Sequence, residues 1–262
     1  MSGALRVARD GAFVRVTLAR PEVRNAFDAG LIEELRATFE AFGSEPADTL
    51  RGVVMGGEGA TFCAGADVAW MRQAIGLTVA DNERDAAAMQ AMFTAVERCP
   101  APVIARVQGA ALGGGMGLCA AADIVVATAG TAFGFTETKL GILPAVISTF
   151  VLPKIGESHA RALFLTGERF GPERAREIGL VHEVVADEEA LEARVSELLD
   201  ELRGAGPTAV RAAKALLLDL RTRTGADGLA ETVRRIAAQR TSAEGLEGLT
   251  AFLERRPAAW GG

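Results

Sequence analysis

The chain has 262 residues, of which 49% are hydrophobic and 24% are charged, and its formal net charge is −6. This composition is ordinary for a globular protein, so it excludes a disordered chain, and the length allows a substantial core. No apolar run approaches the roughly 18–20 residues that span a bilayer. The net negative charge also lacks the basic footprint of a nucleic-acid-binding protein. We therefore expect neither a membrane nor a nucleic acid as partner.

The N-terminus and the cysteines bear on cellular location. Residues 1–6 lack a basic segment followed by an apolar one, so we expect no signal peptide. Cys63, Cys99 and Cys119 form an odd number without metal-ligand spacing, which is typical of reduced thiols. The sequence thus predicts a cytoplasmic protein without a bound metal.

The first half of the chain alternates strand and helix patterns. Residues 11–19 alternate as in a strand. Asp28 suits a helix N-cap, because apolar residues follow it at helical spacing (Leu31, Ile32, Leu35, Phe39 and Phe42). Further strands are predicted at 52–55, 103–107 and 123–128, with helices over 80–98 and from the glycine run to Ala122. This alternation predicts an α/β core.

Beyond Pro153 helical patterns dominate. The predicted helices cover 158–165, 172–178, 188–203, 208–221, 227–240 and 243–254. Pro172 and Pro207 suit first-turn positions of helices. We therefore divide the chain into an α/β core, residues 1–200, and a helical C-terminal region, residues 201–262.

Two stretches of small residues follow apolar runs and predict a site. Residues 108–117, Gln-Gly-Ala-Ala-Leu-Gly-Gly-Gly-Met-Gly, suggest a strand, a tight turn and a helix start. Residues 61–67, Thr-Phe-Cys-Ala-Gly-Ala-Asp, follow the strand at 52–55. A helix start offers unpaired N–H groups, and glycine lets a ligand approach the backbone. A triple glycine alone also fits a close helix–strand crossing. Two such turns facing one pocket would supply two donors to a developing oxyanion.

Six stretches together resemble the enoyl-CoA hydratase/isomerase (crotonase) superfamily over nearly the whole chain. They are residues 20–26 (Arg-Pro-Glu-Val-Arg-Asn-Ala), 63–67, 109–115, 133–137 (Phe-Gly-Phe-Thr-Glu), 165–168 (Leu-Thr-Gly-Glu) and 251–257 (Ala-Phe-Leu-Glu-Arg-Arg-Pro). The resemblance is greatest to bacterial enoyl-CoA and methylglutaconyl-CoA hydratase-like members. It implies a crotonase-like spiral of ββα units with a helical C-terminal region that trimerises, giving a homotrimer or a dimer of trimers. It also implies an acyl-CoA thioester substrate and no separate cofactor, because coenzyme A is part of that substrate.

Glu137 is the leading catalytic candidate. It lies among apolar residues and glycines, so burial would raise its pKa toward the range useful for proton transfer. The alternative is a solvated glutamate paired with Lys139 or a nearby arginine. The resemblance implies that Glu137 handles the proton at the reacting carbon, while the N–H groups of Ala64 and Gly114 hold the thioester enolate.

The acyl-CoA is expected to contact a set of residues drawn from the matching stretches. Arg24 would reach a phosphate, since guanidinium matches phosphate geometry, and Asp67 is expected chiefly to cap a helix. The resemblance suggests that two residues near the C-terminus help to close the coenzyme A site. The expected contacts are Arg24, Ala26, Ala64, Gly65, Ala66, Asp67, Val68, Leu112, Gly114, Thr136, Phe252 and Arg255.

Gly117 departs from the pattern of the family's two-glutamate hydratases, which carry a second glutamate at this position. The single-glutamate pattern is similar to bacterial hydratases of branched glutaconyl-CoA esters, and it is compatible with one-base isomerases. Three functions stay open: hydration of a 2-enoyl-CoA, a double-bond shift in a 3-enoyl-CoA, and non-catalytic binding of acyl-CoA or RNA. His159 and His182 have no partner at metal or triad spacing, so both are expected to be structural.

Overall fold

The computed structural model describes residues 3–261, so Met1, Ser2 and Gly262 lie outside it. Its centre is a six-stranded sheet in the order β1-β2-β3-β4-β6-β9, in which β1 is antiparallel to β2 and the other neighbours are parallel. These strands are β1 (Leu5–Asp10), β2 (Phe13–Leu18), β3 (Gly52–Gly57), β4 (Val103–Val107), β6 (Ile124–Thr128) and β9 (Glu183–Val185). A second sheet joins β5 (Ala110–Leu112), β7 (Ala132–Gly134) and β8 (Arg169–Phe170).

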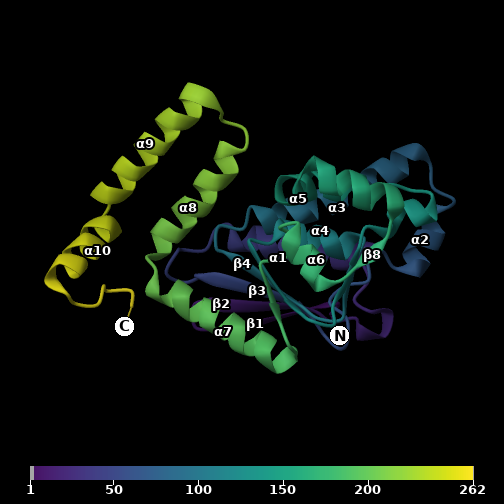
Figure 1. Ribbon diagram of the computed structural model, residues 1–262, viewed down its shortest axis with the longest axis horizontal. Helices are drawn as coiled ribbons and strands as arrows, with labels where there is room; N and C mark the ends of the chain where they lie inside the picture. The colour runs from purple at the N-terminus through teal and green to yellow at the C-terminus, as the bar shows by residue number, and fades with distance from the viewer. Residues whose placement is uncertain (1–2, 262) are drawn as a thin grey trace.

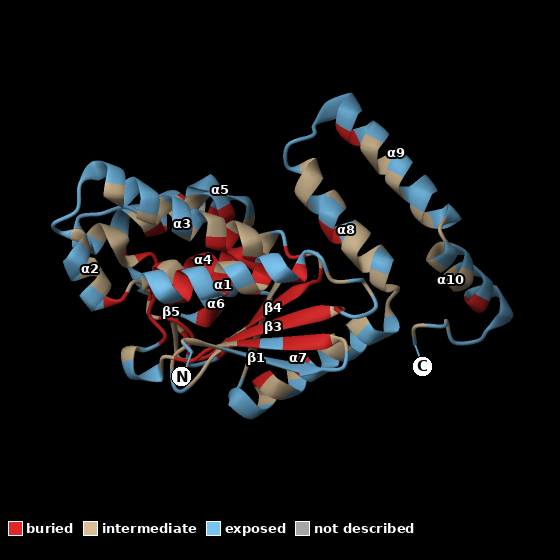
Figure 2. Cartoon of the chain, turned by 180° about the vertical axis from the view of Figure 1, so that it is seen from behind, coloured by how far each residue is buried: buried red, intermediate tan, exposed pale blue. Residues whose placement is uncertain are grey.

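Helices cover both faces of the large sheet (Figure 1). One face carries α7 (Glu188–Gly204), packed over a small cluster formed by Val54, Ile104 and Val195. The other face carries the main core and five helices: α1 (Ala29–Phe42), α3 (Val79–Glu97), α4 (Gly114–Ala121), α5 (Ala145–Thr166) and α6 (Pro172–Glu177). Because both faces are covered, the central strands are apolar along their length and appear buried in Figure 2.

Local signals that the sequence carries explain several helix boundaries. The carboxylate of Asp28 accepts the Leu31 N–H at 2.8 Å, which confirms it as the N-cap of α1. Thr78 and Asp81 form a capping box at the start of α3. The predicted strands at 11–19, 52–55, 103–107 and 123–128 correspond to β2, β3, β4 and β6. The α/β core is therefore confirmed.

The sequence prediction missed elements whose partners are distant. Beyond Pro153 the chain was expected to be helical, but it also forms β8 and β9, which are only two and three residues long. β1 and the first half of α5 were missed as well. The helix expected at 158–165 is the second half of α5, which a kink at Gly156, where φ is 71°, separates from the first half. Such short strands exist because long-range partners hold them, not because of local preference.

An arm of three helices extends from the body: α8 (Pro207–Leu220), α9 (Gly225–Thr241) and α10 (Ala243–Glu254) (Figure 1). Lys214 anchors α8 by donating to Asp123 Oδ2 at 2.6 Å. The arm exposes large apolar side chains, namely Leu217, Leu229, Val233, Ile236, Leu246, Leu249, Phe252 and Leu253. The division of the chain at residue 200 stays a prediction. Among residues 3–261, none of the helices has the length and apolar character needed to cross a membrane.

Candidate active site

A backbone bridge brings the two small-residue stretches together. The Cys63 N–H donates to the Ala110 carbonyl at 3.0 Å, and the Leu112 N–H donates to the Cys63 carbonyl at 3.0 Å. Gly65 also lies close to Leu112, because a β-carbon on Gly65 would lie 3.0 Å from the Leu112 carbonyl oxygen. The loop at 64–67 therefore lies against the turn that opens α4, as expected.

The turn itself requires glycine for two different reasons. Gly113 has φ 50° and ψ −117°, a conformation that side chains disfavour. A β-carbon on Gly114 would lie 2.5 Å from the Phe27 ring, so the packing leaves no room for one. Gly114 is the first residue of α4, and its N–H has no acceptor within the helix. The Gly114 N–H is thus available to a ligand.

The second expected donor, Ala64, is already engaged, because its N–H donates to the Arg24 carbonyl at 3.0 Å. The prediction that Ala64 offers a free donor is therefore wrong. Ala66 is different: the Phe27 N–H donates to the Gly65 carbonyl at 2.7 Å, and the Asp67 N–H donates to the Phe27 carbonyl at 2.8 Å. These bonds hold the chain on both sides of Ala66, whose own N–H has no acceptor among residues 3–261. Ala66 and Gly114 accordingly each offer an N–H group without an acceptor in the described chain.

Glu137 lies beside this turn, on the 3₁₀ helix η2 (Thr136–Leu140). Its Oε1 is 3.5 Å from the point where a β-carbon on Gly113 would lie. Its Oε2 is buried and has no hydrogen-bond partner within the described chain, and no ion pair joins the carboxylate to Lys139 there. Burial raises the pKa of Glu137, and its own backbone N–H only partly offsets that effect. A carboxylate in this state can take up and release a proton.

A groove of about 560 Å³ lies along the loop at 64–67, and neither Glu137 nor Gly114 lines it. Six of the expected acyl-CoA contacts line it: Arg24, Ala26, Ala64, Ala66, Asp67 and Val68. Arg72, on α2 (Val68–Ala74), also lines it and was not predicted. Gly65 and Leu112 form the contact between the loop and the turn, and Thr136 immediately precedes Glu137. The groove thus joins an exposed arginine at residue 24 to the free donor at Ala66.

Of the six expected contacts that do not line this groove, two lie on the arm. Phe252 and Arg255 lie at the end of the arm, where α10 packs against α8 and α9. The Phe252 side chain is 80% exposed. Their contact with acyl-CoA stays a prediction.

Apolar side chains fill the space beside Gly117. A β-carbon there would lie 2.5 Å from Ile147 Cγ2 and 2.6 Å from Phe93 Cζ. The Phe93 ring is fully buried and packs against Phe27 and Phe150, with ring centroids at 6.2 Å and 5.7 Å. It cannot swing away without disturbing the core. The packing around Gly117 therefore leaves no room for a glutamate side chain at this position.

Other polar candidates have structural roles. Asp67 accepts the N–H groups of Ala69 and Trp70 at 2.7 Å and 3.4 Å, which confirms it as the N-cap of α2. His182 Nδ1 accepts the Val125 N–H at 3.0 Å, and burial lowers the pKa of this histidine. In the described chain, no three His, Cys, Asp or Glu side chains are grouped so that they could hold a metal ion.

Phe27 and Ala66 are the site residues whose positions the sequence did not reveal. Phe27 fixes the loop through both of its backbone bonds and fills the space beside Gly114 with its ring. Nothing in a lone phenylalanine after Asn25-Ala26 signals this role. Ala64 and Ala66 flank Gly65 symmetrically, so residue type cannot tell which N–H is free.

Comparisons with known proteins identify the family of this chain. A family model described as "Enoyl-CoA hydratase/isomerase" matches residues 9–262. A crotonyl-CoA hydratase of Syntrophomonas wolfei is 33% identical over 248 residues, covering 91% of this chain and 90% of that protein. The crystal structure of an enoyl-CoA hydratase from Shewanella pealeana has a TM-score of 0.92 at 34% identity, covering 98% of this chain and 96% of that one. Pseudomonas aeruginosa AtuE has a TM-score of 0.95 at 37% identity, covering 99% and 100% of the two chains.

Proposed function

Since the chain belongs to the enoyl-CoA hydratase/isomerase family and is an enzyme of that family, we propose that it hydrates the double bond of a 2-enoyl-CoA. The observation that carries this proposal is the pair of free N–H donors, at Ala66 and Gly114, beside the unpaired carboxylate of Glu137. A thioester carbonyl oxygen placed between the two donors would be polarised toward an enolate. The loss of one good oxyanion donor costs about 3–4 kcal/mol of transition-state stabilisation.

The single carboxylate, Glu137, then transfers protons between the water and the substrate. As the oxygen of water bonds to C3, the electrons of the C2–C3 double bond move toward the thioester oxygen. Glu137 accepts the proton that the water loses and delivers one to C2, so that H and OH are added without any change in the enzyme. Water is held by backbone and substrate groups, because Phe93 and Ile147 occupy the space that a second carboxylate would need.

The substrate is an acyl-CoA thioester, with its coenzyme A part in the groove near Arg24. A branched, glutaconyl-type acyl group fits the single-glutamate pattern. We also propose that the active enzyme is a homotrimer or a dimer of trimers, in which the apolar face of the arm is covered. In such an assembly Phe252 and Arg255 of one copy would reach the site of another.

A double-bond isomerase is the second candidate, and the apolar surroundings of Gly117 favour it. A shift from 3-enoyl-CoA to 2-enoyl-CoA needs one base that removes a C2 proton and returns it at C4, with no water. The same donors and Glu137 would serve this reaction.

Purified protein incubated with crotonyl-CoA, 3-methylglutaconyl-CoA and a 3-enoyl-CoA separates the two candidates. Hydration removes the absorbance of the conjugated enoyl thioester, whereas isomerisation creates it. We expect the absorbance to fall with one of the conjugated substrates. A rise with the 3-enoyl-CoA, without hydration of either conjugated ester, would establish the isomerase instead.

A further inference from the structure

Arg20 joins three segments around the loop that carries Ala66. One of its guanidinium nitrogens donates to the Ala26 carbonyl at 2.6 Å. Its second terminal nitrogen lies 2.9 Å from Asp28 Oδ2 and 2.9 Å from Asp67 Oδ2. The Arg20 side chain is only 17% exposed. A single planar group thus fixes the residue before Phe27 and the N-cap carboxylates of both α1 and α2.

These contacts bracket the Ala66 donor. Phe27 holds Ala66 by bonds to the residues on either side of it, and Arg20 binds the carbonyl of the residue before Phe27. Arg20 also binds the side chain of Asp67, the residue after Ala66. One guanidinium is therefore linked to both backbone neighbours of Ala66, directly to Asp67 and, through Ala26 and Phe27, to Gly65. Its planar fork suits such simultaneous donation better than a lysine ammonium does.

Electrostatics makes the arrangement depend on the arginine charge. Burial opposes ionisation of Asp67, but the N–H groups of Ala69 and Trp70 and the charge of Arg20 outweigh it and lower the pKa of Asp67. Asp28 shares the same guanidinium nitrogen. Without Arg20 the two carboxylates would face each other with nothing between them, and repulsion would move Asp67 together with the backbone at Ala66.

We propose that Arg20 is a positioning residue for oxyanion stabilisation: it sets the direction of the Ala66 N–H without touching the substrate. The inference rests on the proposed function, since it presupposes a thioester oxygen between Ala66 and Gly114. It goes beyond that function by assigning catalytic geometry to a side chain outside the groove lining. Displacement of a catalytic group by about 1 Å can cost roughly 10²-fold in rate.

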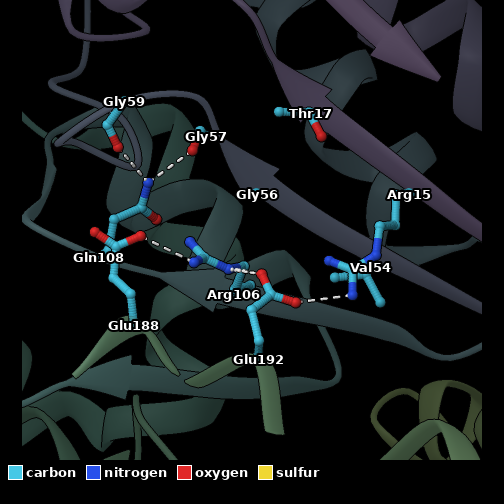
Figure 3. Close-up of a pocket in the computed structure, with 10 residues that line it drawn as sticks. All are labelled: Arg15, Thr17, Val54, Gly56, Gly57, Gly59, Arg106, Gln108, Glu188 and Glu192. Atoms are coloured by element: carbon cyan, nitrogen blue, oxygen red, sulfur yellow. Dashed lines mark hydrogen bonds and ion pairs between the residues drawn. The ribbon is translucent and has the colours of Figure 1, made fainter. Parts of the chain in front are cut away.

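The chain offers a matched control in a separate cavity, which Figure 3 shows. Arg106, on β4, is 12% exposed and also pairs with two carboxylates, those of Glu188 and Glu192 on α7. These three residues line a cavity of about 190 Å³ that shares no lining residue with the groove. Arg106→Met therefore removes a comparable buried arginine without disturbing the Ala66 loop.

The test uses a chromophoric enoyl thioester, 4-(dimethylamino)cinnamoyl-CoA, whose absorbance moves to longer wavelength when its carbonyl oxygen is polarised. We expect the wild type and Arg106→Met to shift its absorbance equally. Arg20→Met should bind the probe with nearly unchanged affinity, but the red shift should shrink and kcat should fall roughly 10²-fold. Arg24→Ala should do the reverse, weakening binding while leaving the shift of the bound probe intact.

Each remaining outcome decides the inference. An unchanged red shift in Arg20→Met, or equal losses of kcat in Arg20→Met and Arg106→Met, would assign Arg20 a merely structural role. If Arg20→Met does not fold, Arg20→Gln keeps a hydrogen-bond donor but removes the charge between Asp28 and Asp67, and a red shift equal to that of wild type in this variant would overturn the inference. If the wild type neither binds the probe nor turns over enoyl-CoA, the proposed function fails and this inference fails with it.

Discussion

At the residue scale, Glu137 is a carboxyl group in surroundings that disfavour its charged form. The carboxylate has one buried oxygen without a partner in the described chain, and it lies beside a turn with a free N–H donor. A purely structural glutamate would be paired or solvated. The cost of leaving this one unpaired is consistent with a role in proton transfer.

Glu137→Gln should separate binding from chemistry. The substitution keeps the size of the side chain but removes the proton acceptor, so turnover should fall roughly 10²–10⁴-fold. Because the groove and the two N–H donors are untouched, the affinity for a non-reacting acyl-CoA should be retained. Steady-state kinetics and calorimetric titration measure the two quantities. Near-normal turnover would transfer the proton-transfer role to another acid.

The raised pKa of Glu137 predicts the direction of the pH dependence. In the dehydration direction the enzyme must remove the C2 proton of a 3-hydroxyacyl-CoA, which requires the ionised carboxylate. The value of kcat/KM should therefore fall as pH falls, with an apparent pKa above the usual value of about 4.3 for glutamate. A pH–rate profile of the free enzyme measures it. A flat acidic limb down to pH 4 would contradict this assignment.

At the scale of elements, α4 connects the core to the site. Its first residues are glycines that allow the backbone to meet Phe27 and the loop at 64–67, and its body is fully buried. Gly117 lies one turn into α4, where the side chains of Phe93 and Ile147 pack against it. The side-chain packing that fixes the turn at Gly113 and Gly114 is therefore continuous with the packing that excludes a carboxylate at position 117.

Gly117→Glu should lower stability and should not increase hydration of crotonyl-CoA. Overpacking of a core typically costs about 1–3 kcal/mol, and here a carboxylate would be buried as well. Chemical denaturation should show the loss relative to wild type. Gly130→Glu is a suitable control, since a β-carbon at Gly130 meets nothing within 4 Å. A stable Gly117→Glu variant with faster hydration would show that Phe93 and Ile147 can move to accommodate the glutamate, and it would contradict this prediction.

At the scale of the whole molecule, the arm of α8, α9 and α10 leaves many apolar side chains in solvent. Monomeric proteins rarely expose contiguous apolar patches larger than a few hundred Å². A partly buried ion pair between Lys214 and Asp123 fixes the arm to the body, so the exposed face has a defined position. Such a face suits association with further copies of the chain.

We expect a trimer or a hexamer in solution at micromolar concentration. Light scattering coupled to size-exclusion chromatography gives the molar mass. Leu249→Arg, which places a charge on the exposed face of α10, should lower the molar mass toward that of the monomer. A wild-type chain that remains monomeric at this concentration would contradict the proposed assembly.

The sequence by itself determined those features whose physical causes are local. The caps at Asp28 and Asp67 bond to N–H groups two or three residues away, so spacing alone predicts them. The strands β2, β3, β4 and β6 are apolar runs long enough to recognise. The turn at 113–114 was predictable because glycine tolerates both the positive φ and the close contact it makes.

Only the tertiary structure decided which groups are free to act. Ala64 and Ala66 are the same residue type on either side of Gly65. Only the Ala64 N–H is engaged, because it donates to the carbonyl of Arg24, 40 positions earlier in the chain. The short strands β5, β8 and β9 likewise exist through distant partners. Hydrogen bonds and close packing between distant segments leave no periodic pattern in a sequence, so the free donor at Ala66 had to be read from the fold.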